Sequence, residues 1–505
     1  MSAPRPGAHD LITTVVDADS FVSWDESIDR SGLGEAYLAA LDAASERSGT
    51  DESVVTGRAR IRGHEVALVV GEFRFLGGSI GRAAAGRIVA AVRRATTERL
   101  PLVAATASGG TRMQEGTPAF MTMVDISAAV VAHKAAGLPY LVYLRHPTTG
   151  GVFASWGSLG HVTIAEPGAL IGFLGPVVYE TLNGVPFPSG VQVAENLVDK
   201  GIVDAVVPTD ELADIAARAL TLLSATTEDH AHPRPRDAAP GSPAAEGEAT
   251  VWRIAPFVSR PEPSEAEIAR LWTAIGITRR EDRPGVRELL RYAADDVIPL
   301  NGTGYGESDK GVMLALASFG ARPCVLVGQD RRYQVAQSMG PAALREARRG
   351  MRMATELGLP LVTVIDTPGA DLSPHAEEGA LAGEIARCIA DMTALTVPSV
   401  SVLLGEGTGG GALALLPARR VVAAGNAWLS PLPPEGASAI VFKDTDHAPL
   451  LAARQRVGAE HMHEDGLVDV IVPEEPAAHV DPQAFARSIG AAVAAQVEAQ
   501  LEALV

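Results

Sequence analysis

LPLVAATASGG runs from Leu100 to Gly110, and LPLVTVIDTPG runs from Leu359 to Gly369. The two stretches start with the same four residues, continue as a short apolar run and end at a glycine turn, and their starts are 259 positions apart. Apolar runs that end in glycine are typical of buried strands in parallel sheets, where ligands bind at the carboxyl ends of the strands. The stretches therefore predict two related modules, each with a site at the end of a strand.

Further landmarks repeat in the same order at nearly the same offset. The tripeptide that ends at Gly81 (SIG) matches the one that ends at Gly340 (SMG), and the glycine pairs that begin at Gly150 and Gly410 also correspond. GIVDAVVP at 201–208 likewise matches GLVDVIVP at 466–473. Because the offset is long and nearly constant, we interpret it as a tandem duplication of a domain of about 200 residues and not as a solenoid.

Residues 225–250, between the copies, are rich in Pro, Ala, Gly and charged residues and show no periodicity, which is typical of a linker. We therefore predict a first domain over residues 1–224, with an N-terminal arm over 1–50, and a second domain over residues 251–505. His230 and His232 lie in the linker, and we interpret them as incidental and not as metal ligands.

Within each copy, β-branched runs alternate with longer Ala-rich stretches of helical spacing. Residues 65–71 and 138–144 are predicted strands, whereas residues 83–98, 120–137 and 485–505 are predicted helices. Met113, Met121 and Met123 are expected in the core. The alternation predicts an α/β fold whose parallel strands are joined by helical crossovers.

The composition limits the classes of function. A formal net charge of −19 argues against nucleic-acid binding, although the basic run at 57–63 is either a local anion site or a solvated strand face. With two cysteines, a disulfide framework and a four-thiolate zinc site are not expected, and Cys324 is predicted to be buried in a strand. No signal peptide or bilayer-length apolar run is evident, so we expect a cytoplasmic protein that does not enter a membrane.

Four glycine turns follow predicted strands, two in each copy: TASGGTR (106–112), TTGGV (148–152), DTPGA (366–370) and GEGTGGGA (405–412). None matches the nucleotide-binding patterns GxGxxG or GxxxxGK[ST] in the required context. Glycine lets the backbone approach a ligand closely, and the first turn of a following helix has unpaired N–H groups. We therefore predict backbone anion holes that stabilise an enolate or a tetrahedral oxyanion.

Charged residues near these turns leave alternatives open. Glu115, Asp366, Glu377 and Glu378 are either bases or, as we favour, groups that cap free N–H groups at helix starts. His146 either faces the site or lies in a solvated loop. The histidines of HMHED (461–465) lack the spacing of a helical metal site, and we place them on the surface.

Longer strings resemble a known family. Residues 75–116, 137–176 and 197–208 resemble the β-subunit of the carboxyltransferase of bacterial acetyl-CoA carboxylase. Residues 357–371, 377–387, 397–415 and 433–452 resemble the α-subunit of the same enzyme. The similarity covers roughly residues 20 to 480 apart from the linker, as in a β–α fusion. It implies two tandem crotonase-like domains, each a spiral of ββα turns.

The resemblance also implies an activity and a site. Members of this family transfer a carboxyl group from carboxybiotin, held on a separate carrier protein, to acetyl-CoA, which gives malonyl-CoA. It places one oxyanion hole at Gly150 and Gly151 and the other at Gly410 and Gly411. The residues that it places around the CoA and biotin pockets are Gly81, Ser108, Gly109, Gly110, Arg112, Gly340, Pro368, Gly369, Ala370 and Ala412.

The partners implied are a biotin carboxylase, a biotin carboxyl carrier protein and a second copy of this chain, in a homodimer or a higher even oligomer. The biotin is the carrier's, and no metal is expected, because the four-cysteine zinc module of bacterial β-subunits has no counterpart before Cys324. Val177 and Pro433 stand where the family commonly has Arg and Ser, which leaves the acyl preference open. A malonyl-CoA-type decarboxylase and a non-catalytic scaffold of the same fold are the alternatives.

Overall fold

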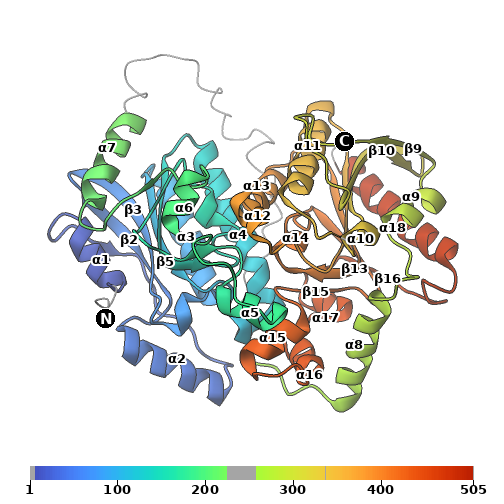
Figure 1. Ribbon diagram of the computed structural model, residues 1–505, viewed down its shortest axis with the longest axis horizontal. Coiled ribbons are helices and arrows are strands. Elements are labelled where there is room, and N and C mark those ends of the chain that lie inside the picture. The colour runs from blue at the N-terminus through green and yellow to red at the C-terminus, as the bar shows by residue number, and fades with distance from the viewer. Residues whose placement is uncertain (1–5, 225–256, 336, 504–505) are drawn as a thin grey trace. The chain divides into compact units, whose positions relative to one another are not determined.

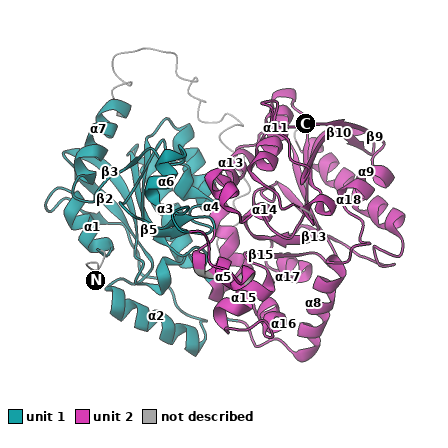
Figure 2. Cartoon of the chain, in the orientation of Figure 1, with its two compact units in different colours: residues 1–112, 125–173, 189–259 teal, residues 113–124, 174–188, 260–505 magenta. Residues whose placement is uncertain are grey.

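The computed structural model describes residues 6–224, 257–335 and 337–503. The predicted linker at 225–250, with His230 and His232, lies outside these residues. The chain divides into two compact units (Figure 2): unit 1 comprises residues 1–112, 125–173 and 189–259, and unit 2 comprises residues 113–124, 174–188 and 260–505. The domain limits expected from the sequence stay a prediction.

Each unit contains one eight-stranded sheet, and the two sheets have the same topology. Figure 1 labels β2, β3 and β5 in the first sheet and β10, β13 and β16 in the second. In unit 1 the order is β1-β2-β3-β4-β5-β6-β8, with β7 beside β5; in unit 2 it is β9-β10-β11-β12-β13-β14-β16, with β15 beside β13. The matching order confirms the predicted duplication. The strands of unit 1 are β1 (Val22–Ser23), β2 (Val54–Ile61), β3 (His64–Gly71), β4 (Leu102–Ser108), β5 (Tyr140–Thr149), β6 (Val162–Ala165), β7 (Ile171–Gly172) and β8 (Ala205–Val206). Those of unit 2 are β9 (Asp296–Leu300), β10 (Val312–Phe319), β11 (Arg322–Gln329), β12 (Leu361–Thr367), β13 (Ser399–Thr408), β14 (Arg420–Ala424), β15 (Trp428–Ser430) and β16 (Val470–Val472).

The predicted parallel strands are confirmed for most of each sheet, but one edge of each sheet is antiparallel, which was not predicted. β2 pairs antiparallel with β1 and β3, and β10 pairs antiparallel with β9 and β11; the later strands are parallel. Arg62 and Gly63 link β2 to β3 with φ of 49° and 84°. Two successive positive φ angles make the type I′ turn that suits a two-residue hairpin loop.

Helices form the crossovers between the parallel strands. They include α3 (Arg82–Thr97), α4 (Gly116–Ala135), α11 (Pro341–Leu357) and α13 (Leu381–Thr393), and the C-terminal helix predicted from the sequence is α18 (Pro482–Glu502). The remaining helices are α1 (Ala8–Val15), α2 (Glu35–Ser48), α5 (Pro176–Asn183), α6 (Ala194–Asp199), α7 (Leu212–Ser224), α8 (Glu265–Thr278), α9 (Val286–Ala293), α10 (Arg331–Gln334), α12 (Pro374–Glu378), α14 (Gly409–Leu413), α15 (Pro434–Val441), α16 (Ala448–Arg454) and α17 (Ala459–Glu464).

The central strands are buried along their whole length, which explains their apolar sequence. Every residue of β4, β12 and β13 is buried. Met121 and Met123 of α4 are also buried, as predicted, whereas the same prediction is wrong for Met113, which is half-buried and precedes α4. Cys324 lies buried in β11, and burial raises the pKa of its thiol to about 12. Arg58 and Arg60 of the basic run are exposed, which favours the solvated strand face over an anion site.

Among the residues that the structure describes, no helix is both long enough and apolar enough to cross a lipid bilayer.

Candidate functional site

Unit 1 brings its two glycine turns into backbone contact. They follow β4 and β5, which are neighbouring parallel strands. A β-carbon built on Gly110 would lie 3.3 Å from the backbone nitrogen of Gly151, and one built on Gly150 would lie 3.3 Å from the carbonyl oxygen of Gly109. Gly110 and Gly150 have φ of 108° and 64°, which residues with side chains adopt only with strain. The close approach of the two turns therefore depends on glycine.

The two amides expected to form the hole in unit 1 are not equivalent. The Gly150 N–H donates to the carbonyl oxygens of Gly172 (3.3 Å) and Phe173 (3.1 Å). The Gly151 N–H finds no acceptor among the residues that the structure describes. Of this pair, only Gly151 offers an open donor.

Unit 2 repeats the arrangement with turns that follow β12 and β13, again neighbouring parallel strands. A β-carbon built on Gly411 would lie 3.2 Å from the backbone nitrogen of Ala370. Gly410 and Gly411 are in the first turn of α14, where N–H groups have no acceptor within the helix, and the described part of the chain supplies none from elsewhere. The Gly369 N–H, by contrast, donates to Thr367 Oγ1 (3.1 Å).

The equivalence of the units identifies a further residue, Thr111. Isolated bridges join Ile80 to Thr111 and Met339 to Ala370, so Thr111 occupies the place that Ala370 has in unit 2. Neither Thr111 nor Ala370 has an acceptor for its N–H within the described residues. The open donors that correspond between the units are therefore Thr111 and Gly151 (the unit 1 amide pair) and Ala370 and Gly411 (the unit 2 amide pair). The Gly410 N–H is also open, but its counterpart in unit 1, the Gly150 N–H, is engaged. The sequence analysis did not single out Thr111, although its position 259 residues before Ala370 was a usable signal.

The helices that follow the two bridges also begin beside these turns. Gly81 is the N-cap of α3 and Gly340 is the N-cap of α11, and both have extended backbones with φ of −96° and −95°. The Gly340 N–H donates to Asp309 Oδ2 (3.0 Å). The first-turn amides of two long helices thus lie next to the turns, where they favour negative charge.

The sequence matches a known family over most of its length. The family described as carboxyl transferase domain matches residues 8–504, which is nearly the whole chain. This chain belongs to the carboxyl transferase domain family. The predicted α/β fold with two related copies is confirmed by the two eight-stranded sheets of matching strand order.

Relatives in this family are similar over nearly their whole length. The chain is 55% identical over 486 residues to the "Probable biotin-dependent acyl-coenzyme A carboxylase beta3 subunit" of Mycobacterium tuberculosis (strain ATCC 25618 / H37Rv), with 96% of this chain and 92% of the relative covered. It is 37% identical over 513 residues to the "Acetyl-coenzyme A carboxylase carboxyl transferase subunits beta/alpha" of Salinispora arenicola (strain CNS-205), with 98% and 88% covered. The crystal structure of transcarboxylase 12S matches at 19% identity and a TM-score of 0.38, with 99% and 90% covered.

In this carboxyl transferase domain, Arg112 lies beneath the first glycine turn of unit 1. The side chain is 1% exposed and forms an ion pair with the buried carboxylate of Glu52, whose Oε2 lies 2.9 Å from Arg112 Nη1. Arg112 also donates to the carbonyl oxygen of Ser79 (2.7 Å), and its own N–H donates to that of Ile80 (3.0 Å). The guanidinium therefore supports the turn from the protein interior.

Ser108 supports the same turn from within. Its Oγ accepts a hydrogen bond from the Gly110 N–H (3.0 Å). Thr367 does the same for Gly369 in unit 2. The amides of Gly110 and Gly369 are thus engaged, which leaves Thr111 and Ala370 as the open donors of these turns.

Asp366 is enclosed behind the unit 2 amide pair. It is 2% exposed, and its Oδ1 accepts from the Glu406 N–H (3.1 Å). Arg331 lies 3.6 Å from the Asp366 carboxylate and 3.2 Å from that of Glu406. Burial raises the pKa of both carboxyl groups, and Arg331 opposes that shift. Asp366 is a member of an enclosed ionic network, so it does not fit the role of an exposed base.

The other charged candidates have structural roles or stay undecided. His146 lies within β5 and is half-buried, so it is not in a solvated loop; its Nδ1 accepts from the Leu170 N–H (3.0 Å), which ties β5 to the residue before β7. Glu377 and Glu378 lie in α12, whose start is capped by Ser373 Oγ (3.2 Å from the Ala376 nitrogen). Glu115 is buried.

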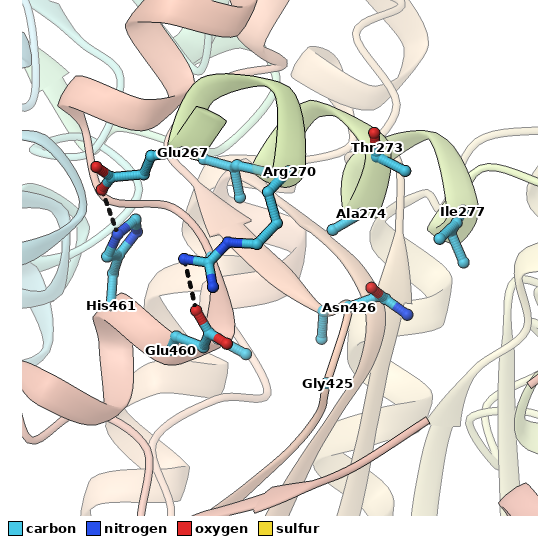
Figure 3. A pocket seen from close by; sticks show the side chains of 13 residues that line it. Glu267, Arg270, Thr273, Ala274, Ile277, Gly425, Asn426, Glu460 and His461 are labelled. Atoms are coloured by element: carbon cyan, nitrogen blue, oxygen red, sulfur yellow. Dashed lines mark hydrogen bonds and ion pairs between the residues drawn. The ribbon is translucent and has the colours of Figure 1, made fainter. Parts of the chain in front are cut away.

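The prediction that both histidines of HMHED lie on the surface is wrong for His461. It is 7% exposed, and its Nε2 lies 3.1 Å from Glu267 Oε1, whereas His463 is exposed. His461 lines a cavity of about 300 Å³ between α8, the loop at 425–427 and the start of α17 (Figure 3). Because Arg270 pairs with Glu460 across it (2.9 Å), the charged groups of this cavity are already matched. No cluster of three metal-ligating side chains occurs in the described part of the chain.

Proposed function

We propose that this chain is the carboxyltransferase component of a biotin-dependent acyl-CoA carboxylase, and that acetyl-CoA is its acyl substrate. The observation that carries the proposal is the pair of open amides in each unit, Thr111 with Gly151 and Ala370 with Gly411, at equivalent turns of a duplicated fold. Membership of the carboxyl transferase domain family supports the reaction class.

The reaction needs two sites for negative charge, which the two amide pairs would supply. The acyl-CoA α-carbon loses a proton and gains a carboxyl group, and the thioester oxygen carries negative charge between these events. One amide pair would hold that oxygen, and the other would hold the ureido oxygen of biotin. Carboxybiotin supplies the carboxyl group and, through its ring nitrogen, the base. This division explains why no acid–base side chain is required beside the turns.

Preorganised backbone donors suffice for a large part of the rate enhancement. Removal of a single oxyanion donor in enzymes typically costs about 3–4 kcal/mol, or a factor of 10² to 10³ in kcat. Glycine at positions 110 and 411 leaves room for an oxygen beside the backbone nitrogens of Gly151 and Ala370, and glycine at position 150 lets the two turns of unit 1 approach each other. The helix starts at Gly81 and Gly340, with Ser108, Gly109, Pro368 and Ala412, would line the CoA and biotin pockets around the amide pairs.

The proposed partners follow from the reaction. A biotin carboxylase must load the biotin, a carrier protein must deliver it, and a second copy of this chain would complete the sites in a homodimer or a larger even assembly. Two relatives support acyl-CoA as the substrate class by their names, one for acyl-CoA and one for acetyl-CoA carboxylase. We place the reaction in the cytoplasm.

The deciding experiment reconstitutes the chain with a biotin carboxylase and a biotinylated carrier. Transfer of label from ¹⁴C-bicarbonate to acetyl-CoA, with propionyl-CoA as the comparison, is expected only when all three proteins and ATP are present. Preference for propionyl-CoA would overturn the acetyl assignment and keep the reaction class. Release of CO₂ from malonyl-CoA without biotin would instead establish a decarboxylase, and no turnover of any acyl-CoA would refute the proposal.

A further inference from the structure

Gln329 links the two turns that form the unit 2 amide pair. It is the last residue of β11 and is fully buried. Its Nε2 donates to the carbonyl oxygen of Gly411 (2.7 Å), and its Oε1 accepts from the N–H of Asp366 (3.1 Å). One side chain therefore holds the turn after β13 and the end of β12 at a fixed separation.

The hydrogen bond to Gly411 fixes the orientation of a whole peptide group. The carbonyl of Gly411 and the N–H of Ala412 belong to one planar trans unit and point in opposite directions. The hydrogen bond from Gln329 restrains rotation of this 411–412 plane. The Gly411 N–H belongs to the preceding peptide group, whose carbonyl oxygen accepts from the Ala414 N–H (2.9 Å). The two hydrogen bonds together fix the backbone on both sides of Gly411, where no side chain restricts rotation.

The hydrogen bond from the Asp366 N–H to Gln329 takes the place of a strand-to-strand hydrogen bond that the sheet does not make here. The register between β12 and β13 shifts between Ile365 and Thr367, and the paired residues of β11 and β12 end at Gly328 and Val364. A buried N–H without an acceptor is costly. Gln329 supplies the acceptor for Asp366 at this irregularity, and in doing so it ties the strand that leads to Ala370 to the other turn.

In the described residues of unit 1, no side chain at the position of Gln329 links the two glycine turns. The last pair in β3 and β4 joins Val70 to Ala105, so Gly71 is the counterpart of Gln329, and Ala107 is the counterpart of Asp366. A β-carbon on Gly71 would lie 2.8 Å from the backbone nitrogen of Ala107, which leaves no room for a side chain. The two amide pairs are therefore held in different ways.

We propose that Gln329 is a positioning residue that sets the spacing and direction of the unit 2 amide pair, and that unit 1 has no equivalent. The effect of Gln329 on catalysis rests on the proposed function, whereas its effect on the orientation of the turn does not. It assigns Gln329 no contact with the substrate, because the side chain is enclosed by protein.

The test compares Gln329→Met with Gln455→Met in the reconstituted enzyme. Methionine keeps the length of glutamine and makes neither hydrogen bond. Gln455 is a matched control, since it is buried in the same unit and donates to the carbonyl oxygen of Met113 (3.4 Å), away from the two turns. Gln329→Met is expected to lower kcat by about 10²-fold, the effect of a displacement of about 1 Å at a reacting centre, with the KM for acyl-CoA within about threefold of wild type. Gln455→Met is expected to leave both constants within about twofold while its Tm falls.

Crystal structures of the wild type and the Gln329→Met variant make the test independent of the proposed function. We expect the 411–412 peptide to rotate or to occupy two orientations in the variant. An unchanged kcat in Gln329→Met overturns the positioning role and leaves the proposed function standing. If the wild type turns over no acyl-CoA, the proposed function fails, and the orientation of the 411–412 peptide alone then upholds or overturns the structural role of Gln329.

Discussion

Substitution of Gly411 by alanine should separate activity from stability. The residue lies in the helical turn α14, and its φ is outside the left-handed region, so alanine is compatible with the backbone. The new methyl group would lie 3.0 Å from Met339 Cε, which is the flexible end of a side chain, and 3.2 Å from the backbone nitrogen of Ala370. The methyl group thus occupies the position from which an oxygen would accept a hydrogen bond from Ala370.

The size of the expected fall in kcat follows from the contact between the new methyl group and the Ala370 nitrogen. Donors in oxyanion holes act at 2.7–3.1 Å, so a carbon at 3.2 Å excludes the oxygen from Ala370, and loss of one donor costs about 3–4 kcal/mol in transition-state stabilisation. We expect kcat to fall by a factor of about 10² to 10³. Stability should change by less than about 1 kcal/mol, because alanine favours a helix over glycine by up to about 1 kcal/mol and offsets the tight contact.

The assay measures kcat for carboxyl transfer and the Tm of the same preparation. Gly276→Ala is the matched control, since Gly276 lies in the helix α8 and a β-carbon there would meet nothing within 4 Å. It should raise stability by about 0.5–1 kcal/mol and keep full turnover. If Gly411→Ala retains at least a third of the wild-type kcat with an unchanged Tm, the Ala370 amide does not face the reacting oxygen and the reasoning is refuted.

Three further predictions concern the folded state. Burial raises the pKa of Asp125 to about 8, so its stabilising contribution is complete below about pH 4 and is lost as the pH rises through 8. In that window the unfolding free energy of the wild type should fall by about 1 kcal/mol for each pH unit. Asp125→Asn should flatten this fall, which chemical denaturation from pH 5 to 9 would show. Arg112→Met leaves the buried carboxylate of Glu52 without its ion-pair partner and should lower the unfolding free energy by about 3–5 kcal/mol. An unchanged urea midpoint would contradict the buried ion pair. Cys324, whose thiol is buried with its pKa raised to about 12, should react with a thiol reagent only after unfolding, so rapid labelling of the native protein would count against its placement.

Features that depend on local sequence were predictable. The apolar runs, the Ala-rich helices and the glycine turns are each encoded within about twenty residues. Because the two halves repeat at an offset of 259 residues, an element predicted in one half also predicts its counterpart in the other. Four glycines of the expected holes lie at the predicted strand ends. The hairpin at Arg62 and Gly63 was missed, although the adjacent β-branched runs and the glycine between them indicated it.

Features that depend on distant segments were not predictable. Nothing within residues 148–152 shows that the carbonyl oxygens of Gly172 and Phe173 reach the Gly150 N–H, because that contact requires β7 to pair with β5. The partner of Arg112 is 60 residues away, and the partner of His461 is 194 residues away. Such contacts are set by the tertiary fold, and a single sequence carries no signal for them.

Unit 2 is built from segments of both halves of the chain, which affects any attempt to divide the protein into two polypeptides. Residues 113–124 and 174–188 come from the first half of the chain but are part of the unit built mainly by the second half. Thr117 illustrates this, since its Oγ1 donates to the carbonyl oxygen of Leu429 (2.9 Å) and its N–H donates to that of Gln455 (3.2 Å). A gene cut within residues 225–256 would thus leave the second polypeptide without two segments of unit 2 and the first polypeptide with those segments separated from the rest of their unit. The two should be recovered folded on co-expression and insoluble when produced singly.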